Sequence, residues 1–240
     1  MTQTEKDNIL GKAKVWFTNS VSNNHLKNAK KLTKLSNFKI NPFTFLYLSN
    51  FLTGNSDPKS VARALIYPRV LGTSINTTFG NAIQKFTNDV LGAYASTTSG
   101  IDIEFIDQVD GHKKYCQLKS GPETINKDDV ATIVGHFKAI KDLGRTNNLR
   151  IHTDDLIVGV VYGTKKELNS FYNMIEANHY HPVHAGTDLW HRLTGDENFY
   201  YELAKSISEV AIEADFASEL NSIVEELAEE IKTKKILPDL

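Results

Sequence analysis

The sequence predicts an α/β fold in which helices flank a central mixed β-sheet and further helices are added at the N- and C-terminal ends. Three observations support this class. Two runs of alternating polar and apolar residues at 99–119 are joined by Asp110-Gly111, a pair typical of β-hairpins. The continuous apolar run LIVGVVYGT at 156–164 is typical of a strand covered on both faces. Apolar residues at helical spacing precede and follow both features, so a sheet covered by helices accounts for all of them.

The chain of 240 residues is long enough to bury a large core, and its 40% hydrophobic and 23% charged residues are ordinary for a globular protein. We expect a single domain over residues 1–240. It would comprise a helical N-terminal region at 1–70, a core at 76–195 and a helical C-terminal region at 196–240.

The first residues lack the apolar segment of a signal peptide, and no later run has the length of a membrane span. We therefore expect a cytoplasmic protein. Cys116 is the single cysteine, which excludes an internal disulfide and the zinc sites that need several thiols.

Charge is distributed unevenly, although the net charge is only -2. Residues 1–39 carry eight lysines against two acids, whereas residues 196–240 carry twelve acids against four lysines. Such asymmetry allows a basic, DNA-binding surface on an acidic protein. Solvated helix faces would explain it equally well.

The N-terminal third is predicted to be helical. The lysine-rich segment 5–36 has apolar residues at helical spacing with an interruption near 20–24, which predicts two helices and a break. Pro42 suits the first turn of a helix containing FTFLYLSNFL, and Gly54 suits its end. Two further helices are expected. The first covers residues 60–67 and is stopped by Pro68, and the second covers residues 77–94.

More helices are predicted after the hairpin. The segment INKDDVATIVGHFKAIKDLG at 125–144 should form a helix that ends at Gly144, and a second helix is expected at 165–177. The next stretch, NHYHPVHAG, is rich in histidine, but its spacing fits no common zinc site. We therefore expect these histidines on the surface or facing DNA: His179, His181, His184 and, further on, His191.

Strand alternation gathers polar residues on one face of the hairpin. Side chains two residues apart share a face, so Asp102 lies with Glu104, and Gln117 lies with Lys119. Cys116 has the opposite parity and is expected in the core. Carboxylates beside an ammonium suit Mg²⁺-dependent hydrolysis of a phosphodiester, because the cation offsets the repulsion between the carboxylates and the negatively charged phosphodiester. Alternation alone favours the other interpretation, a partly exposed hairpin whose charged face is merely solvated.

The order of these residues resembles the signature of the PD-(D/E)xK nuclease superfamily. Gly100-Ile-Asp102 is followed, after fourteen residues, by Gln117-Leu-Lys119. The longer segment QLKSGPETINKDDV at 117–130 is similar to type II restriction endonucleases, in which a comparable Gly-Pro-x-Thr-Ile-Asn loop follows the catalytic lysine. TTFGNAIQKF upstream and DLWHRLTGDENFY at 188–200 are also similar to segments of that group. The resemblance covers residues 76–202, about half of the chain.

The resemblance implies a restriction-endonuclease-like core and a site-specific endonuclease that cuts double-stranded DNA with Mg²⁺ and leaves 5′-phosphate ends. It further implies a homodimer and a restriction–modification system with a cognate DNA methyltransferase. Asp102 would bind Mg²⁺ directly, and Gln117 would contribute its carbonyl oxygen or hold a water of the ion. Lys119 would position and help to activate the attacking water.

Two departures from the family pattern matter. Ile101 replaces the usual proline before the aspartate, a small change because that residue chiefly shapes the entry into the strand. Gln117 replaces the usual acid, and a neutral amide oxygen is a weaker Mg²⁺ ligand than a carboxylate. Compensation is expected from Glu104, or from Gln84 or Asp89 on the preceding helix.

The loop after the lysine offers two candidate DNA-binding residues, Asn126 and Lys127, because Asn suits base edges and Lys suits phosphates. The competing interpretation is a helix N-terminus that Asn126 caps, with Asp128 and Asp129 in the first turn. For the whole protein two alternatives stay open. One is a repair-type or junction nuclease of the same superfamily; the other is a non-catalytic DNA-binding protein, for which Gln117 is the best argument.

Overall fold

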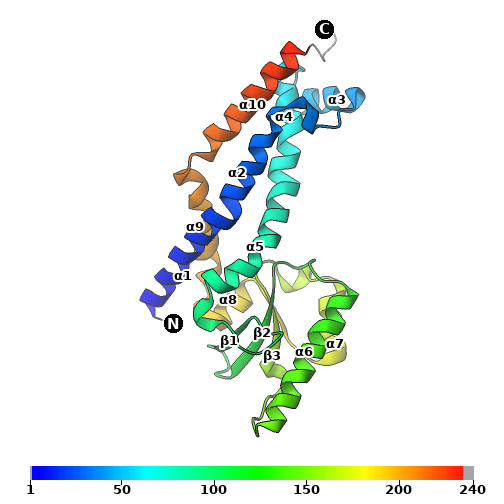
Figure 1. Cartoon of the computed structure of the whole chain (residues 1–240). Helices are drawn as coiled ribbons and strands as arrows, with labels where there is room; N and C mark the ends of the chain where they lie inside the picture. The colour runs from blue at the N-terminus through cyan, green and yellow to red at the C-terminus, as the bar shows by residue number, and fades with distance from the viewer. Residues whose placement is uncertain (1, 235–240) are drawn as a thin grey trace. The chain divides into compact units, whose positions relative to one another are not determined.

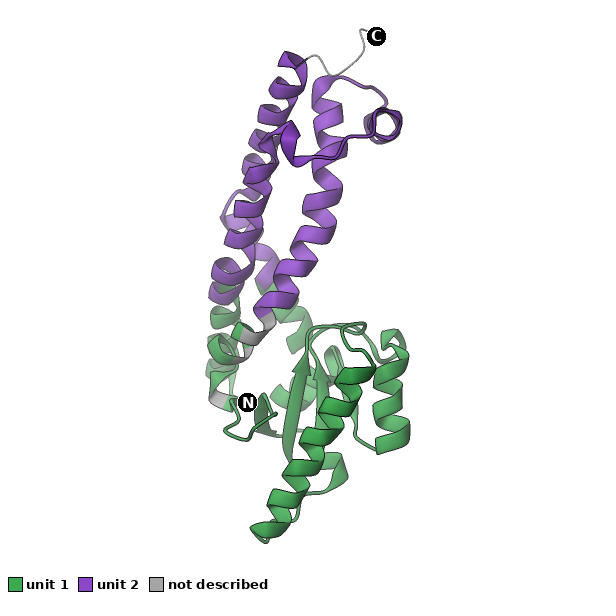
Figure 2. Ribbon diagram, turned by 45° about the vertical axis from the view of Figure 1, so that its right-hand side comes forward, with its two compact units in different colours: residues 1–14, 83–206 green, residues 15–82, 207–240 purple. Residues whose placement is uncertain are grey.

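The computed structural model describes residues 2–234, without the side chains of residues 83, 84, 87 and 93 (Figure 1). The chain divides into two compact units (Figure 2). The sheet unit comprises residues 1–14 and 83–206, and the helical unit comprises residues 15–82 and 207–240. The expectation of a single domain stays a prediction. Within the described residues no helix is both long and apolar enough to cross a membrane.

A four-stranded mixed sheet forms the centre of the sheet unit, as predicted (Figure 1). Its strands lie in the order β1-β2-β3-β4; β1 and β2 are antiparallel, and the other pairs are parallel. The strands are β1 (Ile103–Ile106), β2 (Lys113–Lys119), β3 (Leu156–Val160) and β4 (Val183–Ala185). All five residues of β3 are buried, which confirms the prediction of a covered strand.

The β1–β2 hairpin turns where the sequence predicted. Gly111 has a φ of 74°, a left-handed conformation that favours glycine, and its N–H donates to the carbonyl oxygen of Asp107 at 2.8 Å. Glu104 lies opposite Tyr115 in the register. The register ends with Ile103 opposite Cys116, and continuing it by one pair places Asp102, just before β1, opposite Gln117.

Helices cover both faces of the sheet. The buried side chains of β3 that share a face with Gln117 pack against α6 (Lys127–Thr146) and α7 (Ser170–His179) in one core cluster. On the other face a Cβ at Gly159 would meet Cys116 and Leu189, the latter on α8 (Thr187–Thr194). The polar face of the hairpin is therefore covered at Gln117, which is only 6% exposed, whereas Lys113 on the same face is 51% exposed, so the solvated-face interpretation fits only part of this face.

Helices build the rest of the chain. In the helical unit, buried residues of α4 and α10 form one core cluster. The remaining helices are α1 (Gln3–Trp16), α2 (Asn23–Ala29), α3 (Pro42–Thr53), α4 (Pro58–Pro68), α5 (Ile75–Asp89), α9 (Phe199–Glu213) and α10 (Phe216–Thr233). Pro42 and Gly54 bound α3 as predicted, with Asn41 capping its N-terminus. Helices α1, α5 and α9 contribute residues to both units.

Two local predictions are wrong, and one short strand was not predicted. The expected break near 20–24 is a π-helical turn, Phe17–Ser22, that joins α1 to α2. Pro68 does not stop the helical path, because proline keeps a helical φ, here -61°, and the π-helical turn Arg69–Ser74 leads on into α5. The histidine-rich stretch contains β4, which only three residues form, too few for a recognisable strand pattern.

Candidate active site

Asp102 is held by the backbone of the neighbouring strand. Its N–H donates to the carbonyl oxygen of Cys116 at 3.0 Å, and its Oδ2 accepts the N–H of Leu118 at 2.7 Å. Burial raises the pKa of the Asp102 carboxyl, and this outweighs the Leu118 N–H and the nearby charges of Lys119 and His136, which lower it. A carboxylate whose negative charge is disfavoured by burial is one that a bound cation would stabilise.

Gln117 lies opposite Asp102 and is only 6% exposed. Its Nε2 donates to the carbonyl oxygen of Gly100 and lies 2.6 Å from Nδ1 of His136 on α6. Gly100 has a φ of 80°, and a Cβ there would overlap the His136 ring. Two partners from different elements therefore fix the amide.

Lys119 ends β2 with a side chain that is 27% exposed. Its Nζ lies 3.8 Å from Oδ1 of Asp129, in the first turn of α6. The ammonium is thus held near Asp102 on one side and near the start of α6 on the other, and it still reaches solvent. Such a group can meet a phosphate that arrives from outside.

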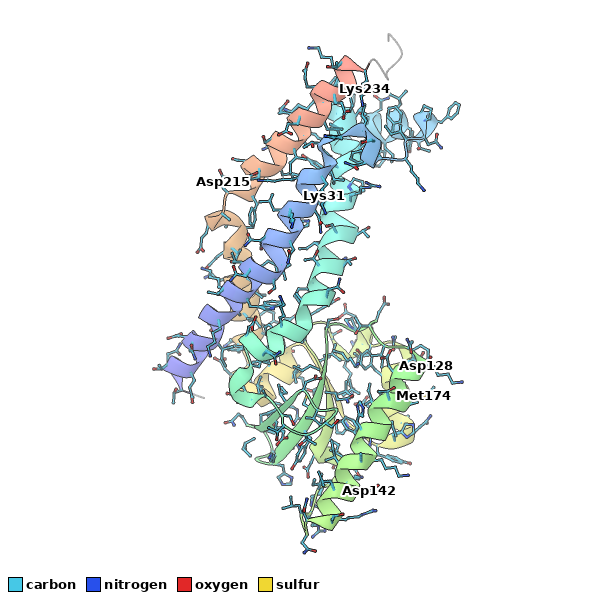
Figure 3. All side chains as sticks on the ribbon, viewed as in Figure 1. Lys31, Asp128, Asp142, Met174, Asp215 and Lys234 are labelled. Carbon is cyan, nitrogen blue, oxygen red and sulfur yellow. The ribbon has the colours of Figure 1, made fainter. Side chains whose placement is uncertain are left out.

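Asn126 caps α6, which begins beside Asp128 and reaches past Asp142 (Figure 3). Oδ1 of Asn126 accepts the N–H of Asp128 at 2.8 Å and that of Asp129 at 3.1 Å, and Oδ2 of Asp129 accepts the N–H of Asn126 at 2.9 Å. The capping interpretation is confirmed. Lys127 is the exposed first residue of α6, and DNA contacts by Asn126 and Lys127 stay a prediction.

Glu104 has protein partners for both carboxylate oxygens. Oε1 accepts from the hydroxyls of Ser96 at 2.5 Å and Thr98 at 2.9 Å, and Oε2 pairs with Lys113 at 2.6 Å. Burial would raise the pKa of Glu104, but the hydrogen bonds and charge of these partners lower it overall. A role as compensating ligand stays a prediction and would require Glu104 to release a partner. The Gln84 side chain lies outside the described residues, and Asp89 is exposed at the end of α5.

Two histidines of the 178–186 stretch, His181 and His184, have separate partners. His181 is buried at 6% and contacts the Phe137 ring, so the expectation of a surface position is wrong for this residue. Nδ1 of His184 lies 2.6 Å from Oδ2 of Asp188. Across the described residues no group of three His, Cys, Asp or Glu side chains could hold a metal ion. Cys116 is fully buried, as predicted, and burial raises the pKa of its thiol.

Sequence reasoning missed three residues of the site: Gly100, Asp129 as a partner of Lys119, and His136. A signal existed for the last two. They are seven residues apart on α6, so they share the helix face that also buries Ile133 and Phe137. No sequence pattern indicated which strand residues this face would meet.

The oxygen atoms of Asp102 and Gln117 are of the kind that a hard divalent cation binds. Asp102 offers a carboxylate, and the Gln117 amide turns its NH₂ group toward Gly100 and His136, which leaves its oxygen facing away from them. Both are the oxygen donors that Mg²⁺ prefers. With one carboxylate and one ammonium at the same end of the β1–β2 hairpin, the arrangement can attract a phosphodiester as well as a cation.

The chain matches a known protein family. A family model described as type II restriction endonuclease EcoO109I matches residues 15–215. That range includes the hairpin, α6 and all three candidate catalytic residues. No curated protein sequence matches the chain.

Proposed function

Because the chain belongs to the type II restriction endonuclease EcoO109I family, and is therefore a site-specific endonuclease that hydrolyses DNA, we propose that it uses Mg²⁺ and acts in a restriction–modification system. The cognate DNA methyltransferase of that system need not bind it. The observation that carries the proposal is the convergence of Asp102, Gln117 and Lys119 on one face of the hairpin, beneath α6. A cytoplasmic location belongs to the same proposal.

Asp102 and the amide oxygen of Gln117 would hold the cation. When bound, Mg²⁺ would offset the negative charge of the scissile phosphate and make phosphorus easier to attack. Lys119 donates a hydrogen bond to the attacking water and stabilises the charge that develops on the phosphate oxygens. Attack in line with the leaving 3′ oxygen yields 5′-phosphate and 3′-hydroxyl ends. Asp129 holds the lysine side chain in place before DNA arrives.

Digestion of unmethylated phage DNA tests this function. Purified protein is incubated with Mg²⁺ or with EDTA, and the fragment ends are sequenced. We expect discrete Mg²⁺-dependent fragments that share one sequence at their ends. A smear would instead support a repair-type nuclease, and DNA left intact with both Mg²⁺ and Mn²⁺ would support a non-catalytic DNA-binding protein.

A homodimer is part of the proposal, and an exposed apolar surface on α3 supports it. The α3 apolar face consists of Phe43, Tyr47, Leu48, Phe51 and Leu52, and Phe43 is 88% exposed. A twofold dimer uses the same face of both copies and suits a palindromic site. The face exposes on the order of 600 Å², so two copies would bury about 1,200 Å², the lower limit of a standard interface.

Sedimentation measures this association. Phe43→Ser combined with Phe51→Ser should convert a dimer into a monomer, because both changes place hydroxyls in the buried face. Ile212→Ser is the matched control, since Ile212 is 79% exposed on α9. Dimers that persist in the double variant would place the interface elsewhere.

A further inference from the structure

The amide of Gln117 has only one orientation compatible with its surroundings. A backbone carbonyl oxygen can only accept hydrogen bonds, so the Gln117 atom that faces Gly100 must be the NH₂ nitrogen. The same nitrogen lies 2.6 Å from Nδ1 of His136. Because an amide NH₂ only donates, Nδ1 must accept, and the proton of a neutral His136 ring is then on Nε2.

The surroundings are shaped for this contact. Gly100 lacks the Cβ that would overlap the His136 ring, and its positive φ suits glycine. Gln117 is almost wholly buried, so a wrongly oriented amide would leave its hydrogen-bonding groups without partners and would be disfavoured. A glutamate at this position would turn a carboxylate oxygen toward the Gly100 carbonyl oxygen, which can only accept, and His136 would have to move its proton to Nδ1 to donate to it.

We propose that His136 is a positioning residue that, together with Gly100, locks the Gln117 amide so that its carbonyl oxygen is presented as a cation ligand. The inference rests on the proposed function of the same site. It makes Gln117 a ligand that its environment selects, rather than the remnant of a lost acid. Residues that orient a metal ligand typically change metal affinity by about 10- to 100-fold when they are replaced.

The tautomer of His136 is measured directly in the wild-type protein by long-range ¹H–¹⁵N NMR, without metal or DNA. We expect the chemical shift of an unprotonated Nδ1 and a protonated Nε2. The signal is assigned by its loss in His136→Leu. A proton on Nδ1 would overturn the proposal, whether or not any variant folds.

Mn²⁺ alone is the probe for the ligand role, because its free-ion EPR signal disappears on binding and needs no catalysis. His136→Leu keeps much of the ring volume but offers no acceptor, so Mn²⁺ affinity should fall about 10- to 100-fold. His136→Gln can turn an amide oxygen toward Gln117 and should restore most of the affinity. The matched control His179→Leu, at the end of α7, should bind as the wild type does. Equal affinity in His136→Leu, or a wild type that binds no Mn²⁺, would overturn the ligand role.

Gln117→Glu separates the two explanations of the amide. If Gln117 were the remnant of an acid, restoring the acid should raise Mn²⁺ affinity. In the surroundings of Gln117, one carboxylate oxygen would take the place of the NH₂ group and meet the Gly100 carbonyl oxygen, so we expect no gain in Mn²⁺ affinity and a lower melting temperature. A tenfold gain without loss of stability would contradict the proposal. Neither the NMR measurement nor Mn²⁺ binding uses DNA, so both test the orientation of the Gln117 amide separately from cleavage. If the proposed nuclease function fails, the DNA stays uncut in the digestion although these two measurements give the expected results. If the amide is not held by His136, these two measurements fail although the DNA is cut.

Discussion

Two faces of the β1–β2 hairpin are built from alternating residues of the same strands, yet they are stabilised differently. Ile103 and Phe105 share one face with Cys116, and all three are buried. On the other face Asp102, Gln117 and Lys119 lie under α6, where burial disfavours charge and each polar group has a named partner. The first face therefore provides stability through packing, whereas the second holds reactive groups at a cost in stability.

Lys119→Ala should have the largest effect of these variants, and it should change cleavage without changing DNA binding. We expect cleavage to fall by about 100- to 1,000-fold, the usual loss when a donor to developing charge is removed. Gel shift should still detect DNA binding. Lys113→Ala is the matched control, because Lys113 lies on the same strand and face but pairs with Glu104. Loss of binding together with cleavage in Lys119→Ala would give the lysine a structural role instead.

Ile103→Ala tests the packed face. Removing this fully buried side chain should lower the free energy of unfolding by about 2 to 5 kcal/mol, since a cavity remains. Urea titration measures the change. Val109→Ala, at a half-exposed position in the hairpin turn, should cost far less, and similar losses in both variants would contradict the distinction between the two faces.

Asp102→Asn should stabilise the protein at neutral pH without divalent ions. The raised pKa of Asp102 means that the folded state disfavours the carboxylate, so an uncharged residue removes a cost. The gain should shrink as pH falls through the folded pKa, where Asp102 itself becomes neutral. Glu104→Gln should have the opposite sign, because the pKa of Glu104 is lowered and its ion pair with Lys113 is stabilising. If thermal or urea unfolding showed both variants to be stabilised, or both to be destabilised, the opposite pKa shifts of Asp102 and Glu104 would be contradicted.

The smallest effect concerns His181, buried under α6 beside Phe137. Burial lowers the pKa of His181, and the charge of Lys141 adds to this, against a hydrogen bond to the Thr153 carbonyl. The unfolded chain then takes up a proton first, so stability is retained above the unfolded pKa of about 6.5 and declines as pH falls below it. His181→Asn should flatten this decline in urea titrations between neutral and mildly acidic pH. An unchanged slope would assign the decline to other groups.

Much of the sheet unit could be predicted from local patterns. The hairpin, the covered strand and α6 each carry a periodicity or a turn signal within one segment. The short strand β4 and the helical turn that follows Pro68 could not be predicted from local patterns, because tertiary packing determines both. In the site, strand parity placed Asp102, Gln117 and Lys119 together. His136 and Gly100 escaped prediction because their contact with Gln117 joins three separate segments of the chain.

The hydrogen bond between the Leu118 N–H and Oδ2 of Asp102 gives the site an internal reporter. The exchange of this amide proton with solvent deuterium depends on a side chain rather than on a ladder of backbone partners. When Asp102 gains a proton or a cation, the carboxylate becomes a weaker acceptor and the Leu118 amide should exchange faster. A single backbone resonance would then follow the charge state of Asp102 in the intact protein, before any DNA is added.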